Sequence, residues 1–443
     1  MIKKSPMTKL YNFSQKVCFL KKVFRKYCFP LCLNRHINLI AALTVSVLLF
    51  TTLTSCWDYV EYEDLAQIIA IGIDYDKHTD NIVLTLQFIP TASSSGSSGS
   101  EQKSGKKGLV HSASDTTLFG ALQKLQQIVD KTFFYGYFKV LIIGQDAAQN
   151  ILVPMMDLHD RTPSIRSSSH IVFTPGKAEN ILSTIDSSHS EIAGNTLANL
   201  LDTVSTTGSS FPVTMQKFIE MLSISGLEAV GPSAYTTVEY IDAKGGTINN
   251  IRANEQKEGK LMVSGLAAFK GGNLAGWLND KESMGLGWVT GKKIKAYKSI
   301  QPKDNGKNDE AYYRVDSSKS KIKIKLVNDM PYVDINIKTT CALRKYYTEN
   351  SSEFIDRKAL SELEDQLSKS IKSDIEAALK KAQKDLQSDI FGFGFEFYRK
   401  YTGLWNERFE KEWNEIFPNI PVNINIDVKI PNTGTNIRSL SVK

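Results

Sequence analysis

Residues 321–338 read KIKIKLVNDMPYVDINIK, and this stretch decides the architecture of the C-terminal part of the chain. Apolar and polar residues alternate on both sides of the central segment Asn328-Asp329-Met330-Pro331. Strict alternation is typical of a strand with one buried face, and a short Asn/Asp/Pro segment between two such runs favours a turn. The stretch therefore predicts two antiparallel strands joined by a turn.

A long amphipathic helix is expected after this pair, over residues 360–386. Leu, Ile and Ala recur there at spacings of three and four, and the other face carries Lys, Asp, Glu and Ser. Residues 420–430 alternate again, which predicts a further strand. We expect a C-terminal antiparallel sheet that the long amphipathic helix crosses, with one face buried and the other exposed to water.

Strands and helices alternate in the preceding part of the chain. Runs rich in apolar and β-branched residues predict strands over residues 65–73, 82–88, 137–143 and 170–173. Apolar residues at helical spacing predict helices over residues 115–131, 147–158 and 177–185. Ser114 and Asp115 are plausible N-caps of the first helix, and Pro154 predicts a kink or an early break in the second. The expected fold class is α/β (α+β), a multi-domain chain of mixed sheets with helices packed on them.

Length and composition indicate how the domains are organised. The chain has 443 residues, of which 42% are hydrophobic and 23% are charged, as in a folded protein of two or three domains. We expect an N-terminal domain over residues 65–245 and a C-terminal domain over residues 261–441, with a possible division near 310. Residues 92–108 are rich in Gly and Ser, which predicts a flexible insertion in the N-terminal domain.

The net charge of +7 comes from the N-terminal segment. Residues 1–55 hold nine Lys and Arg and no acidic residue, so 45 basic and 47 acidic residues remain in the rest of the chain. A nearly neutral body argues against nucleic-acid binding, because backbone phosphates require clustered cations. Five cysteines in a chain of this length exclude a small scaffold held by disulfides.

Residues 1–55 have the order of a bacterial export signal. A basic region precedes the uncharged residues 39–53, which are too few to cross a hydrocarbon core of roughly 30 Å as a helix. Leu53, Thr54, Ser55 and Cys56 then match the lipobox, in which an aliphatic residue and two small residues precede the cysteine that receives the lipid. The alternative is an uncleaved anchor helix beside an unmodified Cys56.

We expect residues 1–55 to be removed and Cys56 to carry a diacylglycerol thioether and an N-acyl chain such as palmitate. More than one chain is needed for stable anchoring, because each buried methylene contributes only about 0.8 kcal/mol. Residues 56–64 would be the lipidated tether, and its eight residues after the cysteine reach at most about 30 Å.

None of the common catalytic or metal-binding motifs occurs in the sequence. His159 and Asp160 are adjacent, and a surface pair at a helix end is the simpler interpretation. We expect the rings in Gly392-Phe393-Gly394-Phe395 to pack inward, because a phosphate loop requires small residues. Trp405 and Trp413 are expected to share a buried helix face, with a carbohydrate site as the alternative. We therefore expect no enzymatic activity, no metal and no cofactor apart from the covalent lipid.

Four short motifs follow one another along the chain. They are Cys56-Trp57-Asp58-x-x-Glu61-x-x-x-Leu65-Ala66 with Ile71-Gly72-Ile73-Asp74; Gly144-Gln145-Asp146-Ala147-Ala148; Gly265-Leu266-Ala267-Ala268-Phe269-Lys270 with Leu274-x-Gly276-Trp277-Leu278 and Glu282-Ser283-x-Gly285; and Asp389-x-Phe391-Gly392-Phe393-Gly394 followed by Trp405, Trp413, Phe417 and Pro418. Together they resemble the C-subunit lipoproteins of spore germinant receptors, the Ger(x)C family, from Cys56 to about Gly434. The long basic region, the insertion near Gly96 and Tyr59-Val60, where many members carry basic residues, depart from the family pattern.

The resemblance implies a lipoprotein on the outer face of the spore inner membrane that is required for nutrient-triggered germination. Its partners would be the membrane A and B subunits of the receptor and, through Cys56, membrane lipid. The motif residues expected to have structural or interaction roles are Trp57, Asp58, Glu61, Gly72, Asp74, Gly276, Trp277, Gly392 and Gly394. Two other classes stay open: a lipid-anchored solute-binding protein of a transporter, which would have two similar lobes, and a cell-wall hydrolase.

Overall fold

The computed structural model describes residues 39–47, 60–90, 109–160, 165–184, 192–237, 260–292, 296–300, 310–347 and 357–432. The chain divides into two compact units, Met1–Tyr62 and Glu63–Lys443. In the first unit, residues 39–47 form a helix within the predicted apolar run. In the described ranges, no helix has both the length and the apolar character that a membrane span requires. The lipobox, Cys56, Trp57 and Asp58 lie outside the described residues.

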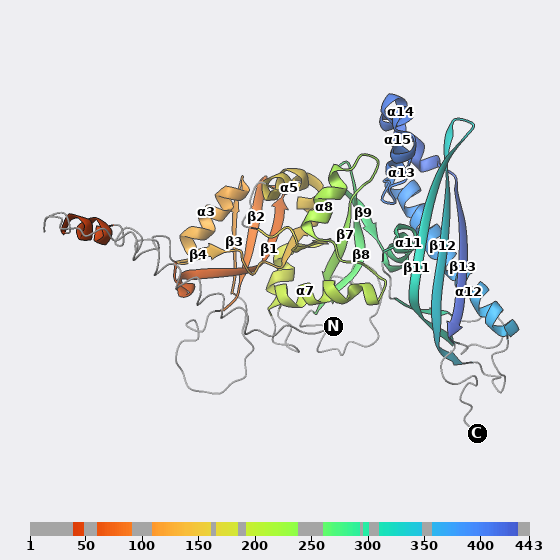
Figure 1. Ribbon diagram of the computed structural model, residues 1–443, viewed down its shortest axis with the longest axis horizontal. Helices are drawn as coiled ribbons and strands as arrows, with labels where there is room; N and C mark the ends of the chain where they lie inside the picture. Colours follow the sequence, from red (N-terminus) through yellow and green to blue (C-terminus); the bar gives the residue numbers. More distant parts are fainter. Residues whose placement is uncertain are drawn as a thin grey trace, which may run out of the picture. The chain divides into compact units, whose positions relative to one another are not determined.

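The second unit contains a large mixed sheet with the strand order β3-β2-β1-β5-β6-β7-β8-β9, in which β4 also pairs with β1 (Figure 1). Its strands are β1 (Leu65–Asp76), β2 (Asn81–Phe88), β3 (Leu109–Asp115), β4 (Thr132–Phe134), β5 (Val140–Gly144), β6 (His170–Thr174), β7 (Val230–Thr236), β8 (Leu261–Lys270) and β9 (Asn273–Leu278). The four central strands β1, β5, β6 and β7 are parallel, and the strands on either side pair antiparallel.

Helices cover both faces of this sheet, as expected for α/β layers. They are α3 (Leu118–Ile128), α4 (Gln145–Asn150), α5 (Leu152–Asp160), α6 (Ala178–Ser183), α7 (Ala193–Thr203) and α8 (Met215–Ser223), with short 3-10 turns at Tyr62–Asp64 and Val204–Thr206. Successive residues of a strand point to opposite faces. Accordingly, Leu141 and Ile143 of β5 belong to the hydrophobic cluster that includes residues of α3, α4, α5 and α8, whereas Val140 and Ile142 belong to the cluster that includes residues of α6 and α7.

The N-cap of α3 differs from the sequence-based prediction, whereas the predicted break before α5 is present. The cap of α3 is Thr117, whose side chain accepts a hydrogen bond from Gly120 N–H at 3.0 Å. Ser114 and Asp115, expected to be caps, instead belong to β3, because the strand pairing with β2 continues through them. The break predicted around Pro154 is confirmed: α4 ends before Ile151, and Pro154 is the third residue of α5, where its missing N–H leaves no helical bond unmade.

A second, four-stranded sheet has the order β10-β11-β12-β13. Its strands are β10 (Tyr297–Ile300), β11 (Glu310–Val327), β12 (Met330–Tyr347) and β13 (Val422–Asn432). The predicted hairpin is confirmed, since Val327 pairs with Met330 across a two-residue turn. Both turn residues, Asn328 (φ 52°) and Asp329 (φ 60°), are left-handed, as a tight hairpin turn requires.

The expectation of an antiparallel C-terminal sheet is wrong for its last strand. β13 pairs parallel with β12, with Val333 opposite Val422, so this sheet is mixed. The cause is the connection: the chain leaves β12, passes along the long helix α12 (Arg357–Lys380), and enters β13 from the end at which β12 begins. A crossover of this kind joins parallel strands.

The predicted amphipathic helix is confirmed. α12 continues into a π-helical segment, Lys381–Leu386, and its buried face includes Leu363, Leu367, Ile371 and Ile375. The other helices are α11 (Asp280–Thr290), α13 (Phe393–Lys400), α14 (Thr402–Leu404), the π-helical Trp405–Phe409, α15 (Glu410–Ile416) and the 3-10 turn Phe417–Asn419. α11 packs directly on α12, because a Cβ on Gly285 would overlap the carbonyl oxygen of Asp374.

The expected domain boundary between residues 245 and 261 lies within the large sheet. Val230 of β7 pairs with Ala268 of β8, so strands from both expected domains form one continuous ladder. The second sheet begins at Tyr297, close to the possible division near 310. A single hydrophobic cluster also includes Ile73 of the first sheet and Ile371 of α12. The division into domains stays a prediction.

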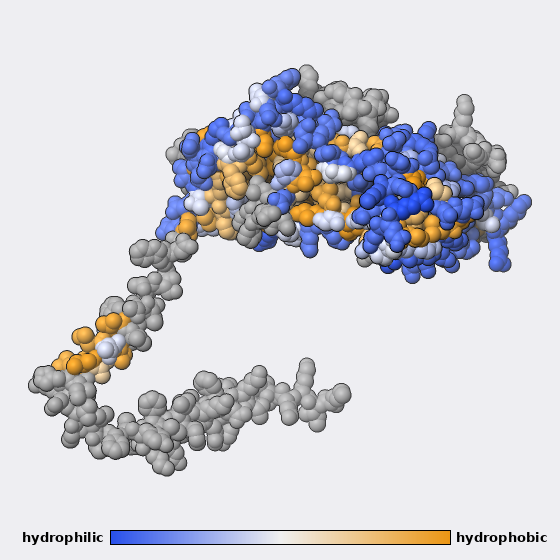
Figure 2. All heavy atoms as spheres, turned by 90° about the horizontal axis from the view of Figure 1, so that it is seen from above, coloured by the Kyte–Doolittle hydropathy of each residue, from blue (hydrophilic) through white to orange (hydrophobic). Residues whose placement is uncertain are grey.

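Apolar residues are exposed on one part of the surface of the second unit. Figure 2 shows apolar atoms exposed between polar ones over the part that carries α3, α5 and α8. Exposed apolar side chains on these helices include Phe119 (59%), Ile128 (61%) and Val153 (49%).

Candidate functional site

The motif residues Gly72 and Asp74 attach a helix to the central strand. Asp74 accepts hydrogen bonds from the backbone N–H groups of Ala178 (2.8 Å) and Glu179 (3.0 Å), at the start of α6. Burial raises the pKa of this carboxyl, and the two hydrogen bonds oppose that effect. A Cβ on Gly72 would lie 3.0 Å from Leu182 Cδ1, so α6 packs directly on the strand. These two residues therefore have structural roles.

Gly276 and Trp277 connect β9 with the start of α4 and with the end of the π-helical segment Lys381–Leu386. The indole N–H of Trp277 donates to Gln145 Oε1 at 3.2 Å, which joins β9 to the start of α4. A Cβ on Gly276 would lie 2.8 Å from Leu386 Cδ2, at the end of the π-helical segment. Glu61, in contrast, is exposed.

The closing motif is organised by Asp389, which is buried (4% exposed) just before α13. Its Oδ1 accepts from Phe393 N–H at 3.0 Å, and its Oδ2 accepts from Gly394 N–H at 2.7 Å and from Trp413 Nε1 at 2.9 Å. Burial raises the pKa of Asp389 to about 6, against the opposing effect of these donors. The carboxylate thus caps α13 and holds α15 against it.

The loop that precedes β7 of the first sheet contacts Asp389 and the start of α13. The carbonyl of Gly226 accepts a hydrogen bond from Phe395 N–H at 2.8 Å, and Glu228 N–H donates to the carbonyl of Asp389 at 3.0 Å. Gly226 has φ +77°, and a Cβ on Gly394 would lie 2.8 Å from Gly226 Cα. We call this set of Gly226, Glu228, Asp389 and Gly394, together with Trp413, the Asp389 junction.

Gly392 and the rings of the closing motif are structural as well. Gly392 has φ +73°, the left-handed conformation that glycine adopts without strain, at the N-cap of α13. Phe393 is buried and stacks on Phe391 with ring centroids 5.2 Å apart, which confirms the inward packing predicted for this ring, whereas Phe395 is only partly buried. Trp405 and Trp413 are also buried, with ring centroids 5.2 Å apart, so the shared buried face predicted for them is confirmed.

A buried ion pair joins β10 to α12. Lys298 Nζ lies 2.5 Å from Asp374 Oδ2, and the two side chains are only 11% and 6% exposed. Trp288 Nε1 donates to the same oxygen at 3.4 Å. Burial raises the pKa of Asp374, while Lys298 lowers it. The pair is placed to hold the second sheet against its helices.

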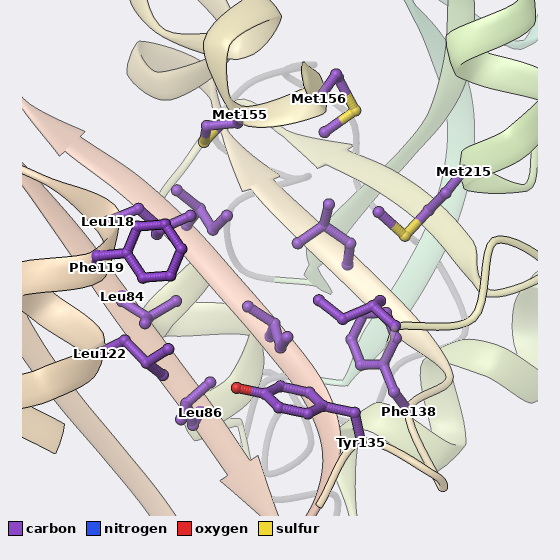
Figure 3. A pocket seen from close by; sticks show the side chains of 14 residues that line it. Leu84, Leu86, Leu118, Phe119, Leu122, Tyr135, Phe138, Met155, Met156 and Met215 are labelled. Atoms are coloured by element: carbon purple, nitrogen blue, oxygen red, sulfur yellow. The ribbon is translucent and has the colours of Figure 1, made fainter. Parts of the chain in front are cut away.

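Hollows occur in several places among the described residues. An apolar cavity of about 100 Å³ lies between the first sheet and helices α3 and α5 (Figure 3). Leucine side chains, Phe119, Phe138 and three methionines surround it, and the Tyr135 hydroxyl points toward Leu84 and Leu86. A more polar hollow of about 230 Å³ borders the Asp389 junction. A third, of about 530 Å³, lies between the two sheets, and Lys292 is among its lining residues.

The described residues contain no group of three or more His, Cys, Asp or Glu that could hold a metal ion. Cys341 is a free, buried cysteine, and burial raises the pKa of its thiol to about 12, which keeps it protonated and unreactive. His159 and Asp160 lie at the end of α5, and their side chains are outside the described structure.

In the sequence, Asp389 stands out only as part of a motif, and no motif includes Gly226 or Lys292. The turn signal Ser225-Gly226 favours a loop at that point, but it does not indicate which backbone the loop contacts. Lys292 carries no local signal, because its burial depends on helices and strands distant in sequence.

Comparisons with known proteins agree in order and extent with the motifs. The family described as "Spore germination protein N-terminal domain" matches residues 58–234, and "Spore germination B3/GerAC like, C-terminal" matches residues 264–434. Spore germination protein KC of Bacillus subtilis (strain 168) is 30% identical over 394 residues, covering 86% of this chain and 93% of that protein.

Two further similarities have lower identity. Spore germination protein B3 of Bacillus subtilis (strain 168) is 24% identical over 405 residues, covering 88% of this chain and 97% of that protein. The crystal structure of the GerBC protein covers 82% of this chain and 97% of its own, with a TM-score of 0.49 and 17% identity.

Proposed function

The chain belongs to the family of GerAC-like spore germination proteins, and from this premise we propose that it is the lipid-anchored C-subunit of a nutrient-germinant receptor. It acts on the outer face of the spore inner membrane by assembling with the membrane A and B subunits. The observation that carries this proposal is the similarity to spore germination protein KC along nearly the whole of both chains.

The structure supports a non-enzymatic role through its buried carboxyl groups. Buried groups with shifted pKa values are candidates for catalysis in general. Here Asp74 and Asp389 are occupied by backbone N–H donors, and Asp374 is paired with Lys298. Each of these groups holds a helix in place, which is a sufficient reason for its burial.

Anchoring through Cys56 gives the subunit its position. The tether between Cys56 and the start of β1 at Leu65 limits the folded body to within about 30 Å of the bilayer. Confinement of this kind raises the effective concentration of the subunit for its membrane partners, so that weak contacts suffice for assembly.

The structure does not favour the alternative of a solute-binding lipoprotein. Such a protein would have two similar lobes, whereas the two sheets here differ in strand number, strand order and helical cover.

The test uses two cysteine variants expressed in the spore-forming host. Cys56→Ala should release the protein from the membrane fraction and lower nutrient-induced germination. Cys341→Ala is the matched control, because it removes the other cysteine after the lipobox and should leave both properties intact. Mass spectrometry of the native protein should find lipid on Cys56.

A soluble Cys56→Ala protein with normal germination would contradict the anchoring role. Loss of germination in a deletion strain, together with co-purification of the A and B subunits with the wild-type protein, tests the assembly role separately. A deletion strain that responds normally to nutrients would contradict the receptor assignment itself.

A further inference from the structure

We propose that the cleft of about 530 Å³ between the two sheets is a binding site for a small amphipathic anion, a carboxylate with an apolar tail. We call it the inter-sheet cleft. Helices α8 and α11 contribute to its wall from the side of the first sheet, and β11 and α13 contribute from the second. Its volume lies within the range of roughly 300–1,000 Å³ that is usual for small-molecule sites.

Apolar residues make up just over half of the lining of the cleft. The apolar side chains come from several separate segments of the chain: Phe211, Met221, Leu227, Val230, Leu286 and Val289, and on the facing side Ile322, Ile390, Phe391 and Phe395. An apolar tail would be removed from water against such a wall, at roughly 25 cal/mol for each Å² buried.

Positive charge dominates the polar groups of the cleft. Four cationic side chains line it, Lys217, Lys292, Lys321 and Arg399, against a single acidic one, Glu396. Lys217 is paired with Glu220, and Arg399 is paired with Glu396, both at 2.8 Å.

Lys292 and Lys321 are the two cations left for a ligand. Neither makes an ion pair in the described part of the chain. Lys292 Nζ lies 5.1 Å from the centroid of the Phe211 ring. The charged group of Lys292 is therefore next to part of the apolar wall. Burial lowers the pKa of Lys292, nearby Lys217 lowers it further, and Glu220 acts in the opposite direction. A carboxylate beside Lys292 would offset the cost of burying its charge.

The other two hollows do not share this combination. The cavity in Figure 3 has no charged lining residue, and the hollow beside the Asp389 junction is lined by Glu228, Asp389 and Glu410. Of these three hollows, charge complementarity therefore selects an anion only for the inter-sheet cleft.

The experiment titrates the purified full chain, in a non-ionic detergent, with three probes that share one apolar group. These are 4-phenylbutanoate, 4-phenylbutan-1-ol and 4-phenylbutylamine, with binding measured by isothermal titration calorimetry against a detergent blank. The carboxylate should bind at least about tenfold more tightly than the alcohol, as for a hydrogen bond between charged groups, and the amine should bind most weakly.

Lys292→Gln should abolish the preference for the carboxylate, and Lys292→Arg should retain it. Lys369→Gln is the matched control, because it removes an equal charge from α12 at a position that does not line the cleft. If Lys292→Gln shows an altered circular dichroism spectrum, the exposed Lys321→Gln replaces it in the same comparison.

Equal affinities for the three probes would overturn the proposal. The same holds if the wild-type chain fails to bind the carboxylate, or if the preference persists in a folded Lys292→Gln protein. None of these results would affect the receptor proposal, which rests on Cys56 and on the partner subunits.

Discussion

The carbonyl oxygen of Gly226 accepts a hydrogen bond at 2.8 Å from the backbone N–H of Phe395, and this contact joins the first sheet to the helices of the closing motif. The two residues are far apart in sequence, and their backbones approach closely because the neighbouring Gly394 also lacks a side chain. Asp389 caps the same helix with its carboxylate, and its backbone carbonyl accepts a hydrogen bond from Glu228 N–H, so this one residue contacts both sides of the junction. The closing motif of the family is therefore a structural joint.

Gly226→Ala should destabilise the folded chain by about 2–4 kcal/mol. The new Cβ would overlap the backbone of Gly394, and alanine is strained at a φ of +77°. Urea unfolding followed by circular dichroism measures the change. Gly271→Ala is the control, because Gly271 also has a positive φ (+57°) but nothing lies within 4 Å of its Cβ position. Only the conformational cost of roughly 1–2 kcal/mol applies there, so equal losses in the two variants would contradict the close-packed junction.

Asp389→Asn should change how stability depends on pH. The carboxyl pKa rises from 3.8 to about 6 on folding, so the folded chain binds an additional proton between these values. The free energy of unfolding contributed by this group therefore falls by about 3 kcal/mol as the pH rises from about 4 to about 6.

The difference between wild type and Asp389→Asn, measured by urea unfolding at pH 4.5 and pH 7, isolates this effect from other buried carboxyls. Asp365→Asn, an exposed position on α12, should follow the wild type. If Asp389→Asn shows the same pH dependence as the wild type, the carboxyl does not titrate in this range.

Lys298→Met should destabilise the protein by about 3–5 kcal/mol, because it leaves the buried Asp374 carboxylate without its cation. The double variant Lys298→Met/Asp374→Leu should recover much of the loss, since no charge then stays buried. Lys369→Met removes an exposed partner of Asp365 and should cost less than about 1 kcal/mol. Thermal unfolding of the wild type and the three variants tests this order of stabilities. A double variant that is no more stable than Lys298→Met would show that the ion pair itself is required.

Leu86→Ala should enlarge the cavity in Figure 3 and cost about 2–5 kcal/mol, because Leu86 is fully buried and lines it. Benzene should restore part of the lost stability by occupying the new space, as apolar cavities stay dry and accept apolar molecules. Phe119→Ala provides the comparison, since Phe119 lines the same cavity but is 59% exposed and should cost far less. A thermal melt of Leu86→Ala that benzene does not shift would indicate that the cavity collapses.

Much of the fold follows from local patterns. The hairpin of β11 and β12, the face of α12 and the break before α5 could all be predicted, because each depends on residues close together in the chain. The family resemblance also followed from short motifs and their order, and the comparisons confirm it. The site residues were harder to interpret: the sequence placed Gly72, Asp74, Gly392 and Gly394 in motifs, while their hydrogen bonds and contacts came from the structure.

The sequence by itself determined the hairpin of β11 and β12, the long amphipathic helix α12 and the family, because periodicity and motif spacing are properties of neighbouring residues. Only the tertiary structure decided that β13 runs parallel to β12, that Gly226 contacts Gly394, and that Lys292 lies in a cleft without a carboxylate partner in the described chain. Strand direction depends on the path of the whole connection, and burial depends on which distant surfaces meet. Neither quantity is encoded in any short stretch of residues.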